Sequence, residues 1–195
     1  SFFETQCLSG ALPSGQNSPQ RCAYGLFAEQ LSGSAFTSPR HENLRTWLYR
    51  IQPAVVHLPF KPLSHPAIDG VGKASGPITP NQLRWDPLPM PDKPTDFLAG
   101  LQPMVTNAIS GERVGAIAYH YSFNAAMDGK YFYSADGEWL FLPEKGEIRL
   151  KTELGNLDVP PGWCAVVPRG VRFQVEAAAG SARGYVCENH GAPLR

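Results

Sequence analysis

The chain has 195 residues, which is enough for one substantial domain with a single buried core. Lys plus Arg and Asp plus Glu each number 17, and this balance argues against nucleic acid as a partner and against a basic membrane-binding face. No stretch approaches the roughly 20 apolar residues of a membrane-spanning helix, and the N-terminus lacks the pattern of a secretion signal. We expect a soluble, cytoplasmic chain whose partners are proteins or small molecules.

Strand signals appear first at residues 45–51, RTWLYRI, where Trp47, Tyr49 and Ile51 alternate with polar neighbours. Glycine and proline number 19 each and are spread along the chain without a repeat period. This distribution favours many short strands joined by turns.

The segment 58–94 is especially rich in proline and cannot sustain helices, because each proline lacks a donor and constrains the residue before it. Leu83, Trp85, Leu88 and Met90 make the segment too apolar for a flexible linker. We therefore predict an ordered meander that packs on other parts of the protein.

Residues 95–105, TDFLAGLQPMV, are the one segment that favours a helix, and Pro103 shortens it. Residues 114–123, VGAIAYHYSF, are mostly β-favouring. From Tyr131 onward, short strand-like runs alternate with turn signals at residues 134–138, 143–147, 153–156, 159–162 and 168–170. This spacing is typical of an antiparallel sandwich or barrel. The sequence thus predicts a mainly β fold with little helix.

The four cysteines, Cys7, Cys22, Cys164 and Cys187, are widely spaced and form no CxxC pair. We expect free thiols, with two disulfides in a secreted protein as the alternative. Cys164 and Cys187 lie in apolar strand-like runs, where a reduced cysteine behaves as a small hydrophobe.

The stretch GWCAVVPRGVRF, residues 162–173, resembles the second sequence motif of the cupin family. Gly162, Pro168 and Gly170 match its spacing, and Phe173 occupies the position where the family carries a metal-binding histidine. Glycine and proline at these positions make tight corners between strands, with or without a metal. The resemblance therefore implies a cupin-like jelly roll that follows the proline-rich meander.

The stretch YFYSADGEWLFLPEKG, residues 131–146, resembles the first cupin motif. Its glutamate falls on Glu138, and its HxH pair falls on Tyr131 and Tyr133. Tyr and Phe side chains are not expected to bind divalent iron or zinc here, and Glu138 alone cannot hold a metal. We interpret Glu138 as a solvated carboxylate at the start of a strand.

The five histidines are His41, His57, His65, His120 and His190, and none of them forms an HxH, HxxxH or His-x-Asp/Glu pattern. His120 lies on an apolar strand and is expected to be a hydrogen-bonded core histidine. GxSxG, Walker and GxGxxG motifs are absent as well. The sequence therefore predicts no catalytic, metal-binding or cofactor-binding residue in this chain.

Longer strings resemble the homogentisate 1,2-dioxygenase family over nearly the whole chain. They are residues 10–40, 43–60, 81–91, 96–101, 132–155, 166–173 and 183–191, and they occur in the family's order. YGLFAEQLSGSAFT, within the first string, is hard to reach by chance. The resemblance implies an iron(II) enzyme that converts homogentisate and O₂ to maleylacetoacetate in tyrosine and phenylalanine breakdown.

The resemblance also implies that this chain holds no iron. In the family two histidines and a glutamate bind iron in the C-terminal half, which this sequence does not contain. The implied arrangement is one N-terminal domain, residues 1–195, with an extension and meander at 1–110 and a cupin-like β-roll at 111–195. Its implied partners are the C-terminal half and further copies in a trimer or hexamer. Aromatic side chains often anchor such contacts, and Phe36, Trp47, Tyr49 and Trp85 are candidates for this role. Each of them also fits an ordinary hydrophobic core.

Three functions thus remain open. The chain is the structural and oligomerisation part of the dioxygenase, inactive alone, whether as a truncated piece or a short gene product. It is alternatively a stand-alone, metal-free cupin-like module that binds a small molecule. A third possibility is an unrecognised metal site built from His41, His57, His120 or His190.

Overall fold

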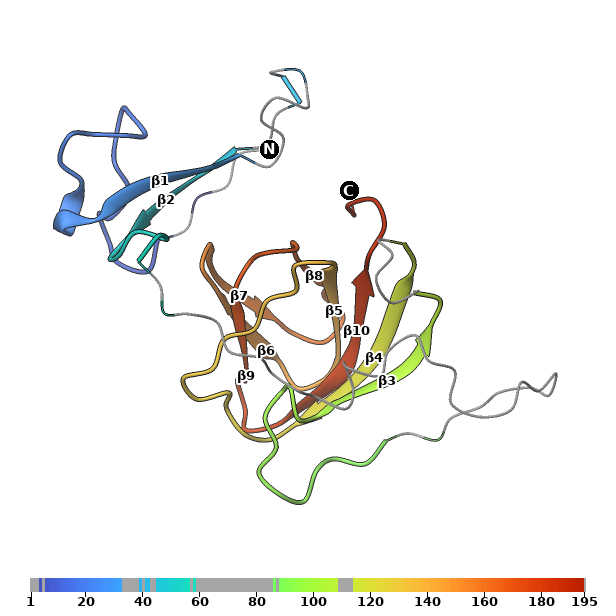
Figure 1. The fold of residues 1–195 in the computed structure, drawn as a ribbon. Coiled ribbons are helices and arrows are strands. Elements are labelled where there is room, and N and C mark those ends of the chain that lie inside the picture. The colour runs from blue at the N-terminus through green and yellow to red at the C-terminus, as the bar shows by residue number, and fades with distance from the viewer. Residues whose placement is uncertain are drawn as a thin grey trace. The chain divides into compact units, whose positions relative to one another are not determined.

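A computed structural model describes residues 4, 6–32, 39, 41–42, 45–56, 58, 86, 88–108 and 114–194. The chain divides into two compact units, residues 1–62 and residues 63–195, which are drawn in Figure 1 and described separately below. Phe36, His57, His65, Leu83 and Trp85 lie outside the described residues.

The first unit is built on a two-stranded antiparallel sheet. Strand β1, Phe27–Ser32, pairs with β2, Arg45–Arg50, and a short 3-10 helix η1, Ala23–Gly25, precedes β1. The hydroxyl of Tyr49 donates to the carbonyl of Asn17 at 2.6 Å and ties the preceding loop to the sheet. The strand predicted at residues 45–51 is confirmed.

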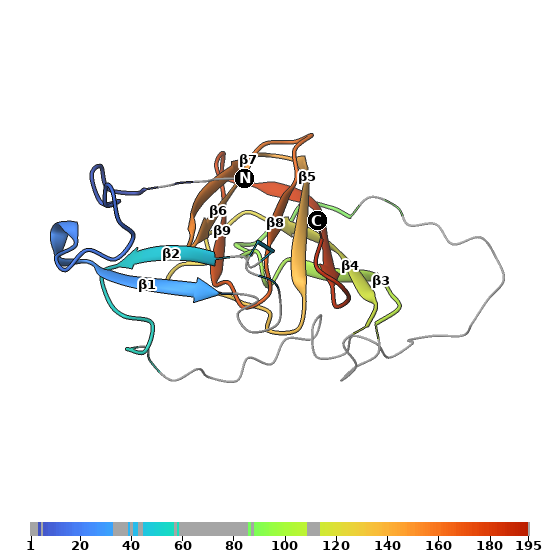
Figure 2. The same cartoon turned by 90° about the horizontal axis from the view of Figure 1, so that it is seen from above.

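The second unit contains two antiparallel sheets. Its strands are β3 Leu101–Thr106, β4 Ala116–Phe123, β5 Glu138–Lys145, β6 Ile148–Thr152, β7 Gly155–Val159, β8 Ala165–Val167, β9 Phe173–Ala177 and β10 Ala182–Asn189. The five-stranded sheet has the order β3-β4-β10-β5-β8, and the three-stranded sheet has the order β7-β6-β9. Figures 1 and 2 show the two sheets curving around a common interior. The predicted mainly β fold with antiparallel sheets is confirmed.

Turns lie at three of the five predicted places, at residues 153–154, 161–162 and 169–170, and bends lie at the other two, at 135–136 and 146. Gly162 and Gly170 have φ angles of +88° and +81°, which a side chain with a Cβ atom rarely adopts. The motif glycines therefore make corners in the chain. Among the described residues, helix is confined to the three residues of η1.

The helix predicted at residues 95–105 was wrong. Asp96 begins one turn, because its Oδ1 accepts from the Ala99 amide at 2.8 Å and its carbonyl accepts from the Gly100 amide at 2.9 Å. The chain then leaves the helical path and forms β3, which pairs with β4. Pro103 is tolerated because β3 is an edge strand. Pairing with β4 thus overrides the local helix preference, and the sheet begins before residue 111.

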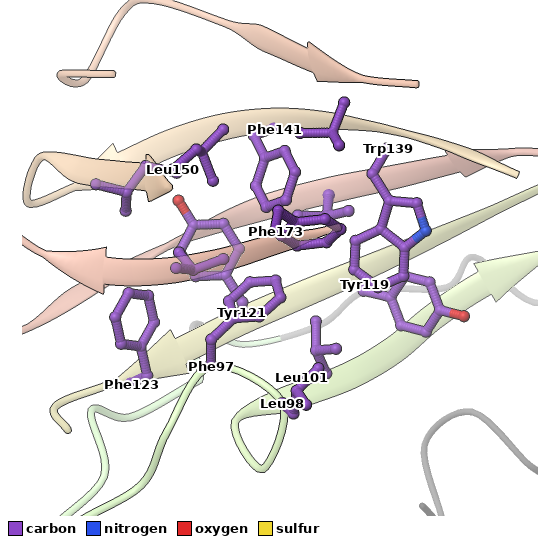
Figure 3. Close-up of a cluster of buried hydrophobic side chains, with 14 of the residues drawn as sticks. Phe97, Leu98, Leu101, Tyr119, Tyr121, Phe123, Trp139, Phe141, Leu150 and Phe173 are labelled. Atoms are coloured by element: carbon purple, nitrogen blue, oxygen red, sulfur yellow. The ribbon is translucent and has the colours of Figure 1, made fainter. Parts of the chain in front are cut away.

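The interior between the sheets is filled with aromatic side chains (Figure 3). Its largest fully buried members are Trp139, Tyr119, Tyr121, Phe97, Phe123, Phe141, Phe173, Met127, Ile148, Leu150, Val175 and Val186. Alternation along β4 and β5 directs every second residue inward, which explains the burial of Tyr119 and Tyr121 on one strand and of Trp139 and Phe141 on the other. Most of the rings meet in tilted and edge-to-face pairs, which aromatic quadrupoles favour, and Tyr119 and Trp139 stack.

Candidate functional site

Phe173 lies deep in the interior. It is 1% exposed, and its ring packs edge-to-face against Phe132 and Phe141 at centroid distances of 5.6 Å. Phe173 thus occupies interior space with an apolar ring. This position offers no ligand atom to a metal.

Tyr131 and Tyr133 do not face the interior. Phe132, between them, is bridged to Phe173 by two backbone hydrogen bonds of 2.9 and 2.8 Å, and its ring packs on Trp139. Because neighbouring residues of an extended chain point to opposite sides, Tyr131 and Tyr133 point outward and are exposed. The residue that faces the interior is therefore Phe132, and the two positions of the HxH pair, Tyr131 and Tyr133, face outward.

Glu138 is buried, so its interpretation as a solvated carboxylate was wrong. Its Oε1 accepts a hydrogen bond from Asn189 Nδ2 at 3.0 Å and another from the Leu194 amide. Residues after β10 fold over the start of β5 and cover the carboxylate. Glu138 thus anchors the end of the described chain.

These four positions do not fit an iron ion. Within the described part of the chain, no three His, Cys, Asp or Glu side chains are grouped in a way that could hold a metal. The interior positions carry aromatic rings, and the one carboxylate is already bound to two amide donors. Iron chemistry is not assigned to any residue described here.

The described histidines have different surroundings. His41 is exposed in a turn, 3.6 Å from the Glu42 carboxylate. His120 is buried on the outward side of β4, where its ring meets Tyr185 edge-on and desolvation lowers its pKa. Its Nδ1 finds no hydrogen-bond partner among the described residues. His190 follows β10 and lies near Glu188.

All four cysteines are free thiols, as predicted. Cys187 is partly buried on β10, and burial raises the pKa of its thiol. Cys164 is exposed just before β8, so its predicted role as a small buried hydrophobe was wrong.

One buried polar cluster, which we call the Glu188 cluster, belongs to none of the motifs in the sequence. Glu188 points inward from β10, and its carboxylate accepts from Tyr119 Oη at 3.1 Å and from Ser134 Oγ at 2.7 Å. His190 Nε2 lies 3.7 Å from the same carboxylate. Alternation along β10 could have predicted this position, because Glu188 lies two residues after the buried Val186 and so faces the same side of the strand.

The Glu188 cluster holds the turn before β5 in place. Ser134 Oγ also accepts from the Gly137 amide at 3.1 Å, so one hydroxyl links the carboxylate to the turn. A Cβ atom on Gly137 would lie 2.6 Å from Glu188 Cγ, which requires glycine at this position. The cluster is therefore a structural network, with its hydrogen-bonding capacity directed at the protein itself.

Burial raises the pKa of the two interior tyrosines, Tyr119 and Tyr121. Desolvation, together with the Glu188 charge and hydrogen bond, raises the pKa of Tyr119 far above its usual value of about 10. Desolvation, with a smaller contribution from Glu144, also raises the pKa of Tyr121. Both phenols stay protonated at neutral pH, so neither can serve as a base.

These raised pKa values predict a loss of stability at high pH. Below about pH 10 the folded and unfolded chains bind the same tyrosine protons, whereas above it only the unfolded chain releases them. The free energy of unfolding should then fall by about 1.4 kcal/mol per pH unit for each buried tyrosine. Urea melts between pH 7 and pH 11.5 measure this slope.

Tyr121→Phe is the matched variant, since the Tyr121 hydroxyl is buried without a partner among the described residues. We expect this variant to be at least as stable as the wild type at pH 7 and to lose less stability above pH 10. Parallel curves for the two chains up to pH 11.5 would show that Tyr121 titrates normally in the folded state.

Three solved structures are similar to part of this chain. The cupin domain of Cnp3 from Schizosaccharomyces pombe matches 46% of this chain and 62% of its own, with 13% identity and a TM-score of 0.39. A cupin-2 domain protein from Shewanella frigidimarina matches 45% and 82%, with 16% identity and a TM-score of 0.35. Hydroxypropylphosphonic acid epoxidase from S. wedmorenis matches 38% and 42%, with 21% identity and a TM-score of 0.33.

Across the residues that the structure describes, no helix combines the length and apolar character needed to cross a membrane. The family described as "Homogentisate 1,2-dioxygenase N-terminal" matches residues 1–195, the full length of the sequence. The chain therefore belongs to the homogentisate 1,2-dioxygenase N-terminal family.

Proposed function

We propose that this chain is the N-terminal structural part of a cytoplasmic homogentisate 1,2-dioxygenase. The observation that carries the proposal is the family match over residues 1–195. In the complete enzyme, iron(II) held by the C-terminal half would support opening of the homogentisate ring with O₂ to give maleylacetoacetate. This chain would supply scaffold and contacts to further copies in a trimer or hexamer.

The packed interior supports a structural role. Phe173, Phe132 and Trp139 fill the region where a cupin-type site would hold its metal, and their rings lie 5.1 to 5.8 Å apart. An inward-facing polar group, Glu188, is engaged by Tyr119 and Ser134. The same packing argues against a stand-alone small-molecule module, because such a module needs open interior space.

Oxygen uptake tests the proposal. We expect no oxygen consumption when the 195-residue chain is mixed with homogentisate and iron(II), because ring cleavage at a non-haem centre needs about three protein ligands and open positions on the iron. The complete enzyme is the positive control. The C-terminal half alone, and both halves mixed, show whether this chain raises the activity of its partner.

Metal analysis of the same preparations gives an independent measurement. The chain purified without chelator should contain far less than one iron or zinc per molecule. Turnover by the chain alone, or near-stoichiometric metal that is lost on His120→Ala or His190→Ala substitution, would instead support the third hypothesis of a histidine metal site.

A further inference from the structure

The backbone of Asp128 is strained. Asp128 lies in a turn with Gly129, in the connection between β4 and β5 (Figure 1), and its φ angle is +22°. This angle lies outside the left-handed region at about +57° that aspartate tolerates, so an L residue is held here in a sparsely populated conformation. Tyr24 is the other non-glycine residue with positive φ in the described part of the chain. Strain of this kind persists only where the surrounding structure imposes it.

The residues on both sides of this turn are fixed by the rest of the unit. Met127 is fully buried, and its Sδ accepts a hydrogen bond from the Val175 amide at 3.3 Å. The Lys130 amide donates to the Met127 carbonyl at 3.1 Å, and Lys130 Nζ lies 2.8 Å from Asp96 Oδ2. Gln174 Nε2 donates to the Lys130 carbonyl at 3.2 Å. The core and these bonds therefore hold the two ends of the turn, with the strained residue between them.

An aspartate that is followed by glycine can react with the main chain, and Asp128 precedes Gly129. The Gly129 amide nitrogen attacks the side-chain carbon Cγ of Asp128, the new C–N bond closes a five-membered succinimide, and one water leaves. Water then adds to either ring carbonyl and breaks its C–N bond, so the ring opens to aspartate or to isoaspartate. The water lost in the first step is regained in the second. The sum is therefore an isomerisation that needs no cofactor, oxidant or reductant.

The surroundings of Asp128 leave the reacting atoms open. Both residues of the turn are exposed, and no hydrogen bond joins the Asp128 carboxylate or the Gly129 amide to another described residue. Apart from its chain neighbours, no atom lies within 4 Å of the position that a Cβ atom on Gly129 would occupy. Glycine also has no side chain that could hinder the attack. Ring closure further allows the backbone of Asp128 to leave its unfavourable conformation, so strain favours the reaction.

A second Asp-Gly pair in this unit is protected against the same reaction. Asp136 precedes Gly137, whose amide donates to Ser134 Oγ at 3.1 Å. Gly137 is buried, and its Cβ position lies 2.6 Å from Glu188 Cγ, so the backbone has little room to rotate. Attack by the Gly137 nitrogen therefore first requires local opening of the Glu188 cluster. A third pair, Asp69–Gly70, lies outside the described residues.

We propose that Asp128 is a modification site at which isoaspartate forms spontaneously in the folded chain. Isoaspartate places one additional carbon atom in the main chain, and the fixed ends of the turn leave no room for it. The hydrogen bond between the Lys130 amide and the Met127 carbonyl is then lost, which lowers the stability of the unit. The modified residue exposes its α-carboxylate, the group that isoaspartyl carboxyl methyltransferases methylate. This inference uses only the turn and its contacts and is independent of the proposed function.

Peptide mapping of the folded 195-residue chain tests the proposal. Trypsin releases residues 114–130 as one peptide and residues 131–145 as another. The first carries Asp128 and the second carries Asp136. After weeks at neutral pH and physiological temperature, electron-transfer fragmentation should show at least about tenfold more isoaspartate in the first peptide, as expected if opening the second pair costs about 1.4 kcal/mol. In guanidinium chloride, which unfolds the chain, the two peptides should contain similar amounts. Similar amounts in the folded chain, or more in the second peptide, overturn the proposal.

Two variants separate Asp128 from other sites and give a second measurement. Asp128→Glu should stop the reaction in the first peptide, because attack on the longer side chain would have to close a six-membered ring. Asp136→Glu is the matched control and should leave isoaspartate in the first peptide unchanged. During incubation the wild type should accept methyl groups from S-adenosylmethionine through an isoaspartyl carboxyl methyltransferase, and the unfolding midpoint of the modified chains should fall by about 3 °C or more. Asp128→Glu should show neither change. Equal methylation of Asp128→Glu and the wild type, or an unchanged midpoint in chains modified at Asp128, contradicts the inference.

Discussion

Trp139→Ala is expected to lower the free energy of unfolding of the second unit by about 3–5 kcal/mol. Trp139 is fully buried and stacks on Tyr119 at a centroid distance of 5.6 Å, while Phe132 and Phe173 pack against it at 5.1 and 5.8 Å. Removing the indole leaves a cavity between the two sheets that the surrounding rings cannot fill. Urea denaturation followed by circular dichroism measures the loss.

Trp139→Phe is the control for this prediction. The Trp139 indole nitrogen is buried without a hydrogen-bond partner among the described residues, so phenylalanine removes an unsatisfied polar atom and keeps a ring in the stack. We expect a loss of less than about half that of Trp139→Ala. If Trp139→Ala changes stability by under about 1 kcal/mol, the aromatic cluster is not the stabilising core of the unit.

Gly184→Val is expected to cost about 3 kcal/mol or more, or to prevent folding. A Cβ atom at Gly184 would lie 2.4 Å from the Leu142 carbonyl oxygen and 2.9 Å from the Glu144 amide nitrogen. Both are backbone atoms of the neighbouring strand β5, and β10 is hydrogen-bonded on both sides, so the backbone cannot move aside. Thermal and urea melts compared with the wild type give the size of the effect.

Gly170→Val is the matched substitution outside the sheets. The φ of +81° at Gly170 is unfavourable for valine, but no atom lies within 4 Å of the new Cβ position. We expect a loss of about 1–3 kcal/mol from backbone strain alone. Gly184→Val should therefore be the more damaging of the two. The reverse order would mean that β10 and β5 can separate at low cost.

Alternation and turn residues determined most of the sheet architecture. Residues 114–123 predicted β4 because they are mostly β-favouring, and Ala116–Phe123 forms that strand. Gly162 and Gly170 predicted corners because glycine readily adopts positive φ, and both have it. These features depend on local chemistry, which is fully present in the sequence.

Motif spacing determined less about the candidate site. Counting from Glu138 placed the HxH pair of the motif on Tyr131 and Tyr133, yet Phe132 is the residue paired with Phe173. A shift of one residue exchanges the two sides of an extended chain, and only the pairing partner decides which side faces the interior. Glu138 was expected in solvent because the local sequence does not show that residues distant along the chain bind and cover its carboxylate.

Composition, alternation and motif order thus determined the fold class of this protein, its free cysteines and its family. The tertiary structure alone decided that Gly100 leads into strand β3 rather than a helix, because the Gly100 carbonyl accepts from the Ser122 amide of β4 at 3.2 Å. It also decided that Glu188 accepts a hydrogen bond from Tyr119, 69 residues away. Such features arise from contacts between segments far apart in sequence, and local propensity carries no information about which segments will meet.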